Sequence, residues 1–415
     1  MQEDVARNPG LLKLDLFCRG IRVDESCRLD DDSRGLHRTR AGLGSGLEVI
    51  IPPEVYTNIP VLEKWVEGTP YSLHREDGRY VIRREGRLIT HVKLLERPKF
   101  YDRRTSSGRL MSSIGVMQGT YLGIYPTRVC HHWEHDPREC CKFCSVGLNL
   151  GEGEAVEKTV RDVVELAIAA RREEHITYVH FNTGYYEGDT YLDDLEPYIT
   201  AVKEATGCLI GVQTPPHPDF SRYDRLRKLG VNQVSFCFEL WDETRFREVC
   251  PGKAEHCTLK RYLDAIEYCA KIFDTTNGEI VAGLEPPAKS IEAIDWMTSV
   301  GAIPTVCVFR PLTGTEYEDV PPPATGEMVP IFRRMYEACM EHGLPLGIAP
   351  NIKVSIVLLP DEGRYFLDNP NRYRLRELML TPVRVLFRAA FWTKLALKSL
   401  RFGGWAKRIS REESA

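Results

Sequence analysis

The sequence predicts an α/β protein: a partial (β/α)6 barrel with a β-rich N-terminal module and a C-terminal extension that ends in a basic helix. Two observations predict this. From about residue 116, six short apolar runs alternate with helical patterns. Before this region, strand-like runs are joined by turns that contain glycine. After it, the sequence becomes rich in basic and aromatic residues. We therefore divide the chain into residues 1–115, 116–345 and 346–415.

Length and composition agree with this division. A chain of 415 residues is long enough for one large α/β domain with an extra module. Hydrophobic residues make up 43%, as in ordinary globular proteins, and the net charge of -4 gives no positive field for nucleic acid. The N-terminus lacks the pattern of a signal peptide, and no apolar run is long enough to span a membrane. We therefore expect a cytoplasmic protein whose 13 scattered cysteines are reduced and form no disulfide framework.

The first module resembles a set of hairpins. Residues 47–51 (LEVII) are a short apolar strand candidate, and a longer alternating stretch starts at Tyr71. Asp77-Gly78 and Glu85-Gly86 supply two tight turns within that stretch. Residues 103–108 (RRTSSG) are polar and have the composition of a linker to the next region.

The central region predicts parallel strands. Strict alternation of strand and helix favours right-handed crossovers, and near-continuous apolar strands indicate that both faces are covered. We favour a barrel or partial barrel over an open doubly wound sheet, although the spacing alone fits both. The six expected strands are residues 119–126, 176–181, 208–214, 233–240, 279–284 and 304–309.

Polar residues gather where these strands end. In both architectures ligands bind at the carboxyl ends of the strands. A cysteine-rich loop, carboxylates, amides and an arginine would therefore meet at one mouth. The candidates in this group are Thr183, Gly184, Tyr185, Tyr186, Gln213, Ser235, Glu239, Gly283, Glu285 and Arg310.

The loop after the first strand holds the strongest signal. Residues 130–144 read CHHWEHDPRECCKFC and contain four cysteines. Three thiolates, with an aromatic residue before the last, can hold an iron–sulfur cluster and leave one iron open. The same cysteines with His131, His132 or His135 would also make a Cys₃His zinc site. A structural or redox loop without metal is the third interpretation.

The loop and its place in the chain resemble the radical S-adenosylmethionine (radical SAM) superfamily. Cys141, Phe143 and Cys144 match the second half of the family's CxxxCxxC pattern, which has an aromatic residue before its last cysteine. The first half of the pattern does not match, because Pro137 stands where the family has its first cysteine, four positions before Cys141. We take Cys130 as the first ligand, and Cys140 is the alternative, although adjacent cysteines rarely ligate one cluster together.

Later segments match the family in the expected order. Residues 278–285 resemble its G-x-I-x-G-x-x-E strand, which packs against adenine, with one residue shifted. FRPLTGT at 309–315 resembles its sixth-strand ending. Glu239 resembles the polar residue that contacts the cofactor. Asn182-Thr183-Gly184 stands where the family has Gly-Gly-Glu, and the match there is poor.

The resemblance implies a [4Fe–4S] cluster and SAM. It implies that a one-electron donor of the flavodoxin or ferredoxin type drives cleavage of SAM to a 5′-deoxyadenosyl radical, which takes hydrogen from a small organic or lipid-like substrate. The implied metal ligands are Cys130, Cys141 and Cys144; the implied cofactor-binding residues are Phe143, Thr183, Gly184, Gln213, Ser235, Glu239, Gly283 and Glu285; Tyr185, Tyr186 and Arg310 are expected to face the substrate. The alternative function is a zinc-stabilised binding or regulatory protein with an α/β core.

The tail supports two interpretations. Residues 346–357 suggest another pair of strands, and residues 375–409 are basic and aromatic. At 100° per residue, five basic side chains fall within roughly a 140° arc, which suits an interfacial helix on anionic lipid. The competing interpretation is a helix that packs on the barrel or on a partner. These basic residues are Arg384, Arg388, Lys394, Lys398 and Arg401.

Overall fold

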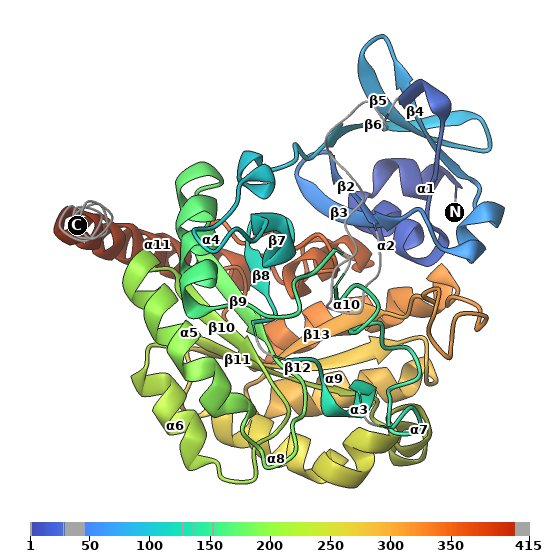
Figure 1. The fold of residues 1–415 in the computed structure, drawn as a ribbon. Coiled ribbons are helices and arrows are strands. Elements are labelled where there is room, and N and C mark those ends of the chain that lie inside the picture. The colour runs from blue at the N-terminus through green and yellow to red at the C-terminus, as the bar shows by residue number, and fades with distance from the viewer. Residues whose placement is uncertain are drawn as a thin grey trace.

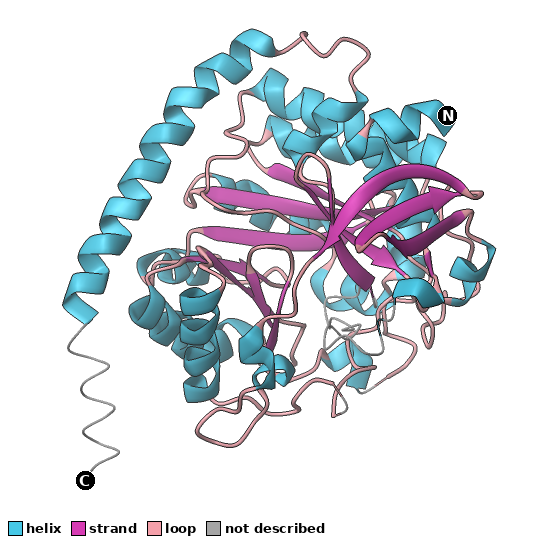
Figure 2. Cartoon of the chain, turned by 90° about the horizontal axis from the view of Figure 1, so that it is seen from above, coloured by secondary structure: helices cyan, strands magenta, loops and turns pink. Residues whose placement is uncertain are grey.

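The computed structural model describes residues 2–27, 29, 46–126, 128–134, 136–151 and 153–402. Two sheets organise these residues, one in the N-terminal part and one in the centre of the chain (Figure 1). The long C-terminal helix α11 (Arg374–Phe402) projects from the side of the molecule (Figures 1 and 2).

The central sheet is a partial barrel of seven strands in the order β13-β12-β11-β10-β9-β8-β7. Six of them run parallel, as predicted, and β7 adds an antiparallel edge that the sequence analysis did not include. The strands are β7 (Gly115–Met117), β8 (Leu122–Ile124), β9 (Tyr178–Asn182), β10 (Leu209–Gln213), β11 (Gln233–Glu239), β12 (Thr275–Ala282) and β13 (Ile303–Val308).

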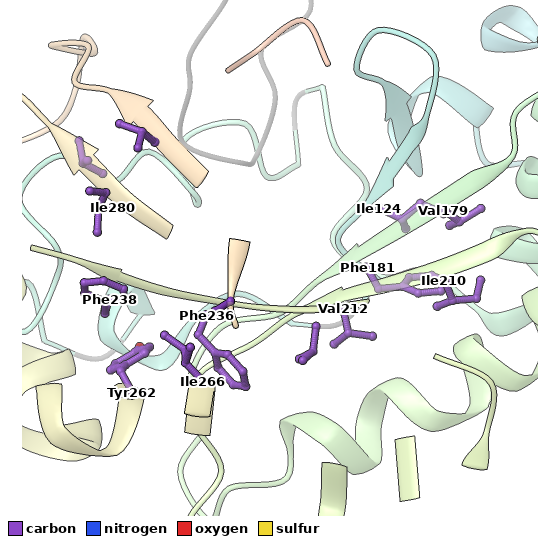
Figure 3. Close-up of a cluster of buried hydrophobic side chains, with 14 of the residues drawn as sticks. Ile124, Val179, Phe181, Ile210, Val212, Phe236, Phe238, Tyr262, Ile266 and Ile280 are labelled. Carbon is purple, nitrogen blue, oxygen red and sulfur yellow. The ribbon is translucent and has the colours of Figure 1, made fainter. Parts of the chain in front are cut away.

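Helices cover the outer face of this sheet (Figure 1). Alternate strand residues such as Val179, Val212 and Phe236 point to the helices and are fully buried among them (Figure 3). The residues between them face the inside of the barrel, and many are polar, so the strands alternate instead of being apolar on both faces. The helices of this region are α3 (His131–Glu134), α4 (Val160–Glu173), α5 (Tyr191–Thr206), α6 (Ser221–Lys228), α7 (Glu243–Val249), α8 (Leu259–Ala270), α9 (Pro287–Ser299) and α10 (Thr325–His342).

The first turn of helix α4 contains a buried carboxylate, that of Asp162. Thr159 caps the helix and Asp162 completes a capping box. Asp162 is fully buried and also accepts hydrogen bonds from Thr105 and Ser107, so the segment expected to be a linker is fastened to the helix. Burial opposes ionisation, but these hydrogen bonds outweigh it and lower the pKa of Asp162 to about 2.

We expect Asp162→Asn to lower the free energy of unfolding by about 2 kcal/mol at pH 7, because the pKa of Asp162 lies nearly two units below that of an unfolded chain. Because the pKa of Asp162 is lower in the folded protein than in the unfolded chain, its carboxylate stabilises the fold fully at pH values above the unfolded pKa. This contribution is lost as the pH falls toward the folded pKa. The difference between variant and wild type should therefore disappear between about pH 4 and pH 2. Urea unfolding across this range checks it, and a difference that is independent of pH would contradict it.

The N-terminal sheet has the order β1-β4-β5-β6-β2-β3. Both predicted turns are confirmed, at Asp77-Gly78 between β4 and β5 and at Glu85-Gly86 between β5 and β6. Helices α1 (Gln2–Arg7) and α2 (Pro9–Arg19) precede the sheet and were not predicted. The strands are β1 (Arg22–Val23), β2 (Gly46–Ile51), β3 (Val55–Pro60), β4 (Tyr71–Glu76), β5 (Arg79–Arg84) and β6 (Arg87–Leu94).

Residues 345–359 form a strap that ties the parts together. The prediction of a strand pair here was wrong, since the segment makes one isolated bridge, between Leu358 and Val306 of β13. Its backbone carbonyls accept hydrogen bonds from the N–H groups of Thr120, before β8, and of Asn58 in β3. Lys13 of α2 donates to the carbonyl of Val354 at 3.0 Å and forms an ion pair with Glu362, which lies just after the strap. The strap therefore fixes the N-terminal sheet against the barrel.

Candidate functional site

A large cavity, with a volume of about 1820 Å³, runs through the partial barrel. At one end it is lined by the cysteine loop and by residues at the carboxyl ends of the strands. At the other end it is lined by the first residues of β10 to β13, by the strap and by α11. The predicted mouth at the strand ends is thus one end of a continuous lumen.

Three backbone hydrogen bonds hold the cysteine loop in place. The N–H of His131 donates to the carbonyl of Tyr185 at 2.8 Å, and the N–H of Lys142 donates to Val249 at 3.0 Å. The carbonyl of Glu139 accepts from Gly252 at 3.0 Å. The loop is therefore positioned by the segment after β9 and by the end of α7 with the residues that follow it.

Three thiols of the loop face the lumen. Cys130, Cys141 and Cys144 line the cavity together with Phe143. Cys140 is outside the cavity lining, and its thiol is directed at the carbonyl of Cys141, 3.5 Å away. The arrangement brings together the three cysteines that the sequence analysis preferred and turns Cys140 away from them.

The thiols differ in acidity. Burial raises the pKa of the Cys130 and Cys144 thiols, and burial raises that of Cys140 to about 12. The pKa of Cys141 is lowered, because the thiol of Cys250 donates a hydrogen bond to it. Cys250 is fully buried behind the loop and supports Cys141 from there.

The thiol spacing does not suit the zinc alternative. In a tetrahedral site with Zn–S bonds of about 2.3 Å, the sulfur atoms lie roughly 4 Å apart. Within the ranges that the structure describes, the donor atoms gathered within 4.8 Å of one another belong to His132, Glu139 and His256, and no cysteine is among them. His135 lies outside the described residues. An iron–sulfur cluster spreads its thiolates more widely, which suits the three thiols facing the lumen.

His132, Glu139 and His256 form a clamp on the loop. Glu139 Oε2 lies 3.1 Å from His132 Nδ1 and 3.3 Å from His256 Nε2. The two rings and Tyr185 stack on one another, with His132 and Tyr185 4.8 Å apart at their centroids. Burial lowers the pKa of His132 to about 4, so the buried ring is neutral at pH 7. The clamp joins α3, the loop and residues 253–257.

The segment after β9 crosses the loop at close range. Thr183 and Gly184 both line the cavity, and a Cβ atom on Gly184 would lie 2.4 Å from Cys130 Cβ and 2.7 Å from its Cα. Such contacts require backbone movement, so only glycine fits beside Cys130. This gives Gly184 a physical role next to the first thiol.

We expect Gly184→Ala to displace Cys130 and lower the iron content after anaerobic reconstitution, at a cost in stability of about 1–3 kcal/mol from overpacking. Gly326→Ala is the control, because a Cβ there would meet nothing within 4 Å. Iron and sulfide analysis of both variants checks the expectation. If the Gly184→Ala protein had the same iron content as the control, Cys130 would not need the close backbone contact with residue 184.

A largely buried ion pair lies close enough to Cys141 to act on it electrostatically. A bulge between Cys237 and Glu239 ends β11, and Glu239 has a φ of 66°, which is rare for a residue other than glycine. The bulge places both side chains on the lumen, and Lys253 donates to the carboxylate of Glu239. Burial opposes the charge of Lys253, but the negative field of Glu239 raises its pKa well above the usual range.

Farther into the lumen, polar side chains form a second group. Gln213 lines the cavity and bonds Glu279 at 3.3 Å. Burial raises the pKa of Glu279 and lowers that of His180 to about 4. Neither His180 Nε2 nor Asn182 Oδ1 has a hydrogen-bond partner among the described residues, although both are buried and line the cavity. These atoms are available to a ligand.

Five predicted site residues lie outside the cavity lining. Tyr185 stacks on the histidine clamp, and the Tyr186 hydroxyl donates to the carbonyl of Arg128 at 2.5 Å. Glu285 accepts hydrogen bonds from the backbone of Trp241 and Asp242, so it braces the start of α7. The other two are Ser235, which is fully buried in β11, and Gly283, which turns away after β12 with a φ of 103°.

Arg310 lines the cavity but is committed to the N-terminal sheet. Its guanidinium donates to the side chain of Asn58 at 3.2 Å and to the carbonyl of Asn58 at 3.1 Å. It also lies over the ring of Phe17, 4.6 Å from the centroid. Burial lowers its pKa to about 10. These contacts make Arg310 a fastening between the barrel and the N-terminal module.

The sequence analysis named His132 only as a possible zinc ligand and Asn182 only within a poor family match, and it missed three further residues that face the lumen. Some left a signal: His132 lies inside the cysteine loop, and Asn182 stands at a strand end. His180 and Glu279 interrupt apolar strands, which is costly for buried polar groups unless they have a purpose. Lys253 left no signal, because it begins a short helical segment after α7 and only the fold brings it to Glu239.

Comparison with known proteins decides the family. Residues 124–297, from the end of β8 into α9, match the model of the radical SAM superfamily. The chain carries a domain of the radical SAM superfamily. It is therefore an enzyme, and its partial barrel is of the radical SAM type.

Individual relatives are more distant. A stretch of 111 residues is 32% identical to bacteriochlorophyllide c C-7(1)-hydroxylase of Chlorobaculum limnaeum and covers 26% of this chain. The match spans only 28% of that relative's length. Among solved structures, methylornithine synthase is 18% identical over 52% of this chain and 60% of its own, with a TM-score of 0.39. A radical SAM methyltransferase from Sphaerobacter thermophilus is 14% identical over 67% and 76%, with a TM-score of 0.41.

Radical SAM enzymes carry a [4Fe–4S] cluster and SAM, and the residues present fit both groups. Three thiols of one loop face a common space, which supplies three ligands and leaves one iron open. The lumen beside them is roomy, and buried polar atoms without partners line it, His180 Nε2 and Asn182 Oδ1 among them.

Proposed function

We propose that this radical SAM enzyme uses Cys130, Cys141 and Cys144 as the ligands of its cluster and abstracts hydrogen from a small organic or lipid-like substrate held in the lumen. When bound, the cluster and SAM supply a 5′-deoxyadenosyl radical, and a donor of the flavodoxin or ferredoxin type supplies the electron. The observation that carries the proposal is the presence of these three thiols on the lumen wall in a chain of this superfamily.

The chain's own residues perform binding and exclusion. Gly184 lets the segment after β9 pass close to Cys130. We assign Phe143, Thr183, Gly184, Gln213 and Glu239 to the cofactor's side of the lumen, because all of them line it. Three further predicted residues lie outside the cavity lining and would only hold the backbone near the site in place. They are Ser235, Gly283 and Glu285.

Other predicted residues act at a distance in this proposal. Tyr185 and Tyr186 hold the cysteine loop, and Arg310 helps to enclose one side of the lumen by fastening the N-terminal sheet beside it. A closed lumen keeps water and stray hydrogen donors from a reactive intermediate.

The substrate is proposed to lie between the thiols and the strap. His180, Glu279 and Gln213 offer it polar contacts in the middle of the lumen, and apolar residues such as Val281 and Val357 line the rest. A cavity of about 1820 Å³ exceeds the few hundred to about 1,000 Å³ of usual small-molecule sites. The cluster and SAM would fill part of this volume, and the remainder leaves room for a lipid-like substrate or for a compound such as the bacteriochlorophyllide in the partial relative's name.

Anaerobic reconstitution followed by dithionite and SAM tests the proposal. Formation of 5′-deoxyadenosine and methionine is the expected result. Incubation with a deuterated candidate substrate should then move deuterium into 5′-deoxyadenosine. A preparation with a full cluster and no 5′-deoxyadenosine would contradict the proposal.

A further inference from the structure

Helix α11 exposes an apolar face to solvent. Seven large apolar side chains on it are between 45% and 74% exposed. At 100° per residue they occupy roughly half of the helix circumference, which is far more than scattered surface residues would. They are Leu375, Leu378, Met379, Val383, Val385, Leu386 and Trp392.

The opposite face of α11 packs on the body of the protein. Arg384 donates to the carbonyl of Leu346 at 2.9 Å and pairs with Glu377, and Arg388 donates to Gly347 at 3.0 Å. The basic arc expected to meet lipid is thus partly bound to the strap, and the apolar side faces outward. Side chains beyond Ala396, including Lys398 and Arg401, lie outside the described residues.

The charges along the helix select an anionic partner. Arg374, Arg376 and Lys394 are exposed at the edges of the apolar face. The sequence of residues 374–402 has one acidic residue, Glu377, and it is paired with Arg384. Apolar side chains bordered by arginine and lysine, with a tryptophan at the edge, suit the interface of an anionic bilayer better than a second copy of this basic helix. No helix in the described ranges has the length and apolar character to cross a bilayer, so the contact would be peripheral.

The cavity reaches the same helix. Thr381, Phe387 and Val385 line the cavity, and Val385 is also 59% exposed. The cavity continues from there past the strap to the thiols. A molecule dissolved in a bilayer under α11 would therefore have a continuous path to the site.

We infer that the exposed face of α11 docks on an anionic lipid bilayer and that the enzyme takes an amphiphilic, membrane-dissolved substrate through the end of the cavity beside it. The choice of substrate class rests on the proposed function, whereas the docking does not. A soluble substrate would have no need for an apolar face at this end of the lumen.

Sedimentation of the full chain with vesicles tests the docking. We expect binding to phosphatidylcholine vesicles that contain phosphatidylglycerol, weaker binding to phosphatidylcholine alone, and a loss of binding at high salt. The Leu378→Glu/Leu386→Glu variant should bind at least about tenfold more weakly, because it places two carboxylates on the apolar face. Both leucines are at least 60% exposed, so the fold should survive.

The matched control is Leu62→Glu/Leu88→Glu, which adds the same charge at two leucines of the N-terminal module that are 53% and 49% exposed. It should bind vesicles like the wild type. Equal binding by both double variants would overturn the docking. A wild-type dimer that Leu378→Glu/Leu386→Glu converts to a monomer, without vesicle binding by either, would also overturn it and assign the face to a second copy.

A separate assay keeps the two proposals apart. SAM cleavage without substrate should be equal in the wild type and the Leu378→Glu/Leu386→Glu variant, since α11 does not touch the thiols. Vesicle binding without any SAM cleavage would refute the proposed function and leave the docking intact. SAM cleavage without vesicle binding would refute the docking alone.

Discussion

Cys130→Ala will leave the protein without its cluster, and with it SAM cleavage will be lost, whereas Cys140→Ala will retain both. Cys130 lines the lumen with Cys141 and Cys144, and its loss removes one of three ligands. Cys140 lies outside the lumen lining and turns toward the carbonyl of Cys141. Iron and sulfide content after anaerobic reconstitution, with the absorbance near 400 nm, gives the readout.

Cys140→Ala is the matched control, since it removes a thiol from the same loop. Circular dichroism of both apo variants separates cluster loss from unfolding. If Cys140→Ala loses the cluster while Cys130→Ala keeps it, the first ligand is Cys140 and the loop must rearrange when the cluster binds.

Lys253→Met will destabilise the protein by about 3–5 kcal/mol, because it leaves the carboxylate of Glu239 buried without its partner. The double variant Glu239→Gln/Lys253→Met removes both charges and should recover much of this loss. The pKa of Lys253 is raised in the folded state, so the pair stabilises fully below about pH 10 and loses its contribution as the pH rises beyond the folded pKa. Denaturant unfolding of the three proteins provides the measurement.

The comparison of single and double variants decides this prediction. A double variant as unstable as Lys253→Met would show that packing, and not charge, is lost. A single variant within 1 kcal/mol of the wild type, about the value of an exposed pair, would show that the pair is not buried in solution.

The strands of the barrel were largely predictable, because each is a short apolar run between helical patterns. Their ends were less so. Strand β12 begins at Thr275, four residues before the predicted start, since Thr276 and Gly278 carry no apolar signal. It ends at Ala282, so Gly283 and Glu285 fall in a turn that leaves the lumen. A residue's place at a strand end therefore does not by itself aim its side chain at the ligand.

Contacts distant in sequence account for the rest. Arg310 is drawn to Asn58, which is 252 residues away, and Lys253 reaches Glu239 from the short helical segment after α7. Periodicity located α11 but could not say which face would pack, since Arg384 and Arg388 use strap carbonyls that no local pattern reveals. Helix α2 did leave a signal, with Asn8 as its cap and Pro9 at its first position, but the strand-rich context of its module outweighed that signal.

Electron paramagnetic resonance of the dithionite-reduced protein, recorded with and without SAM, tests the central claim most directly. Three thiolate ligands leave one iron open, so SAM should bind it and change the spectrum of the reduced [4Fe–4S] cluster. A reconstituted cluster whose spectrum is indifferent to SAM would contradict the account. A colourless protein that holds stoichiometric zinc and takes up no iron would contradict it as well.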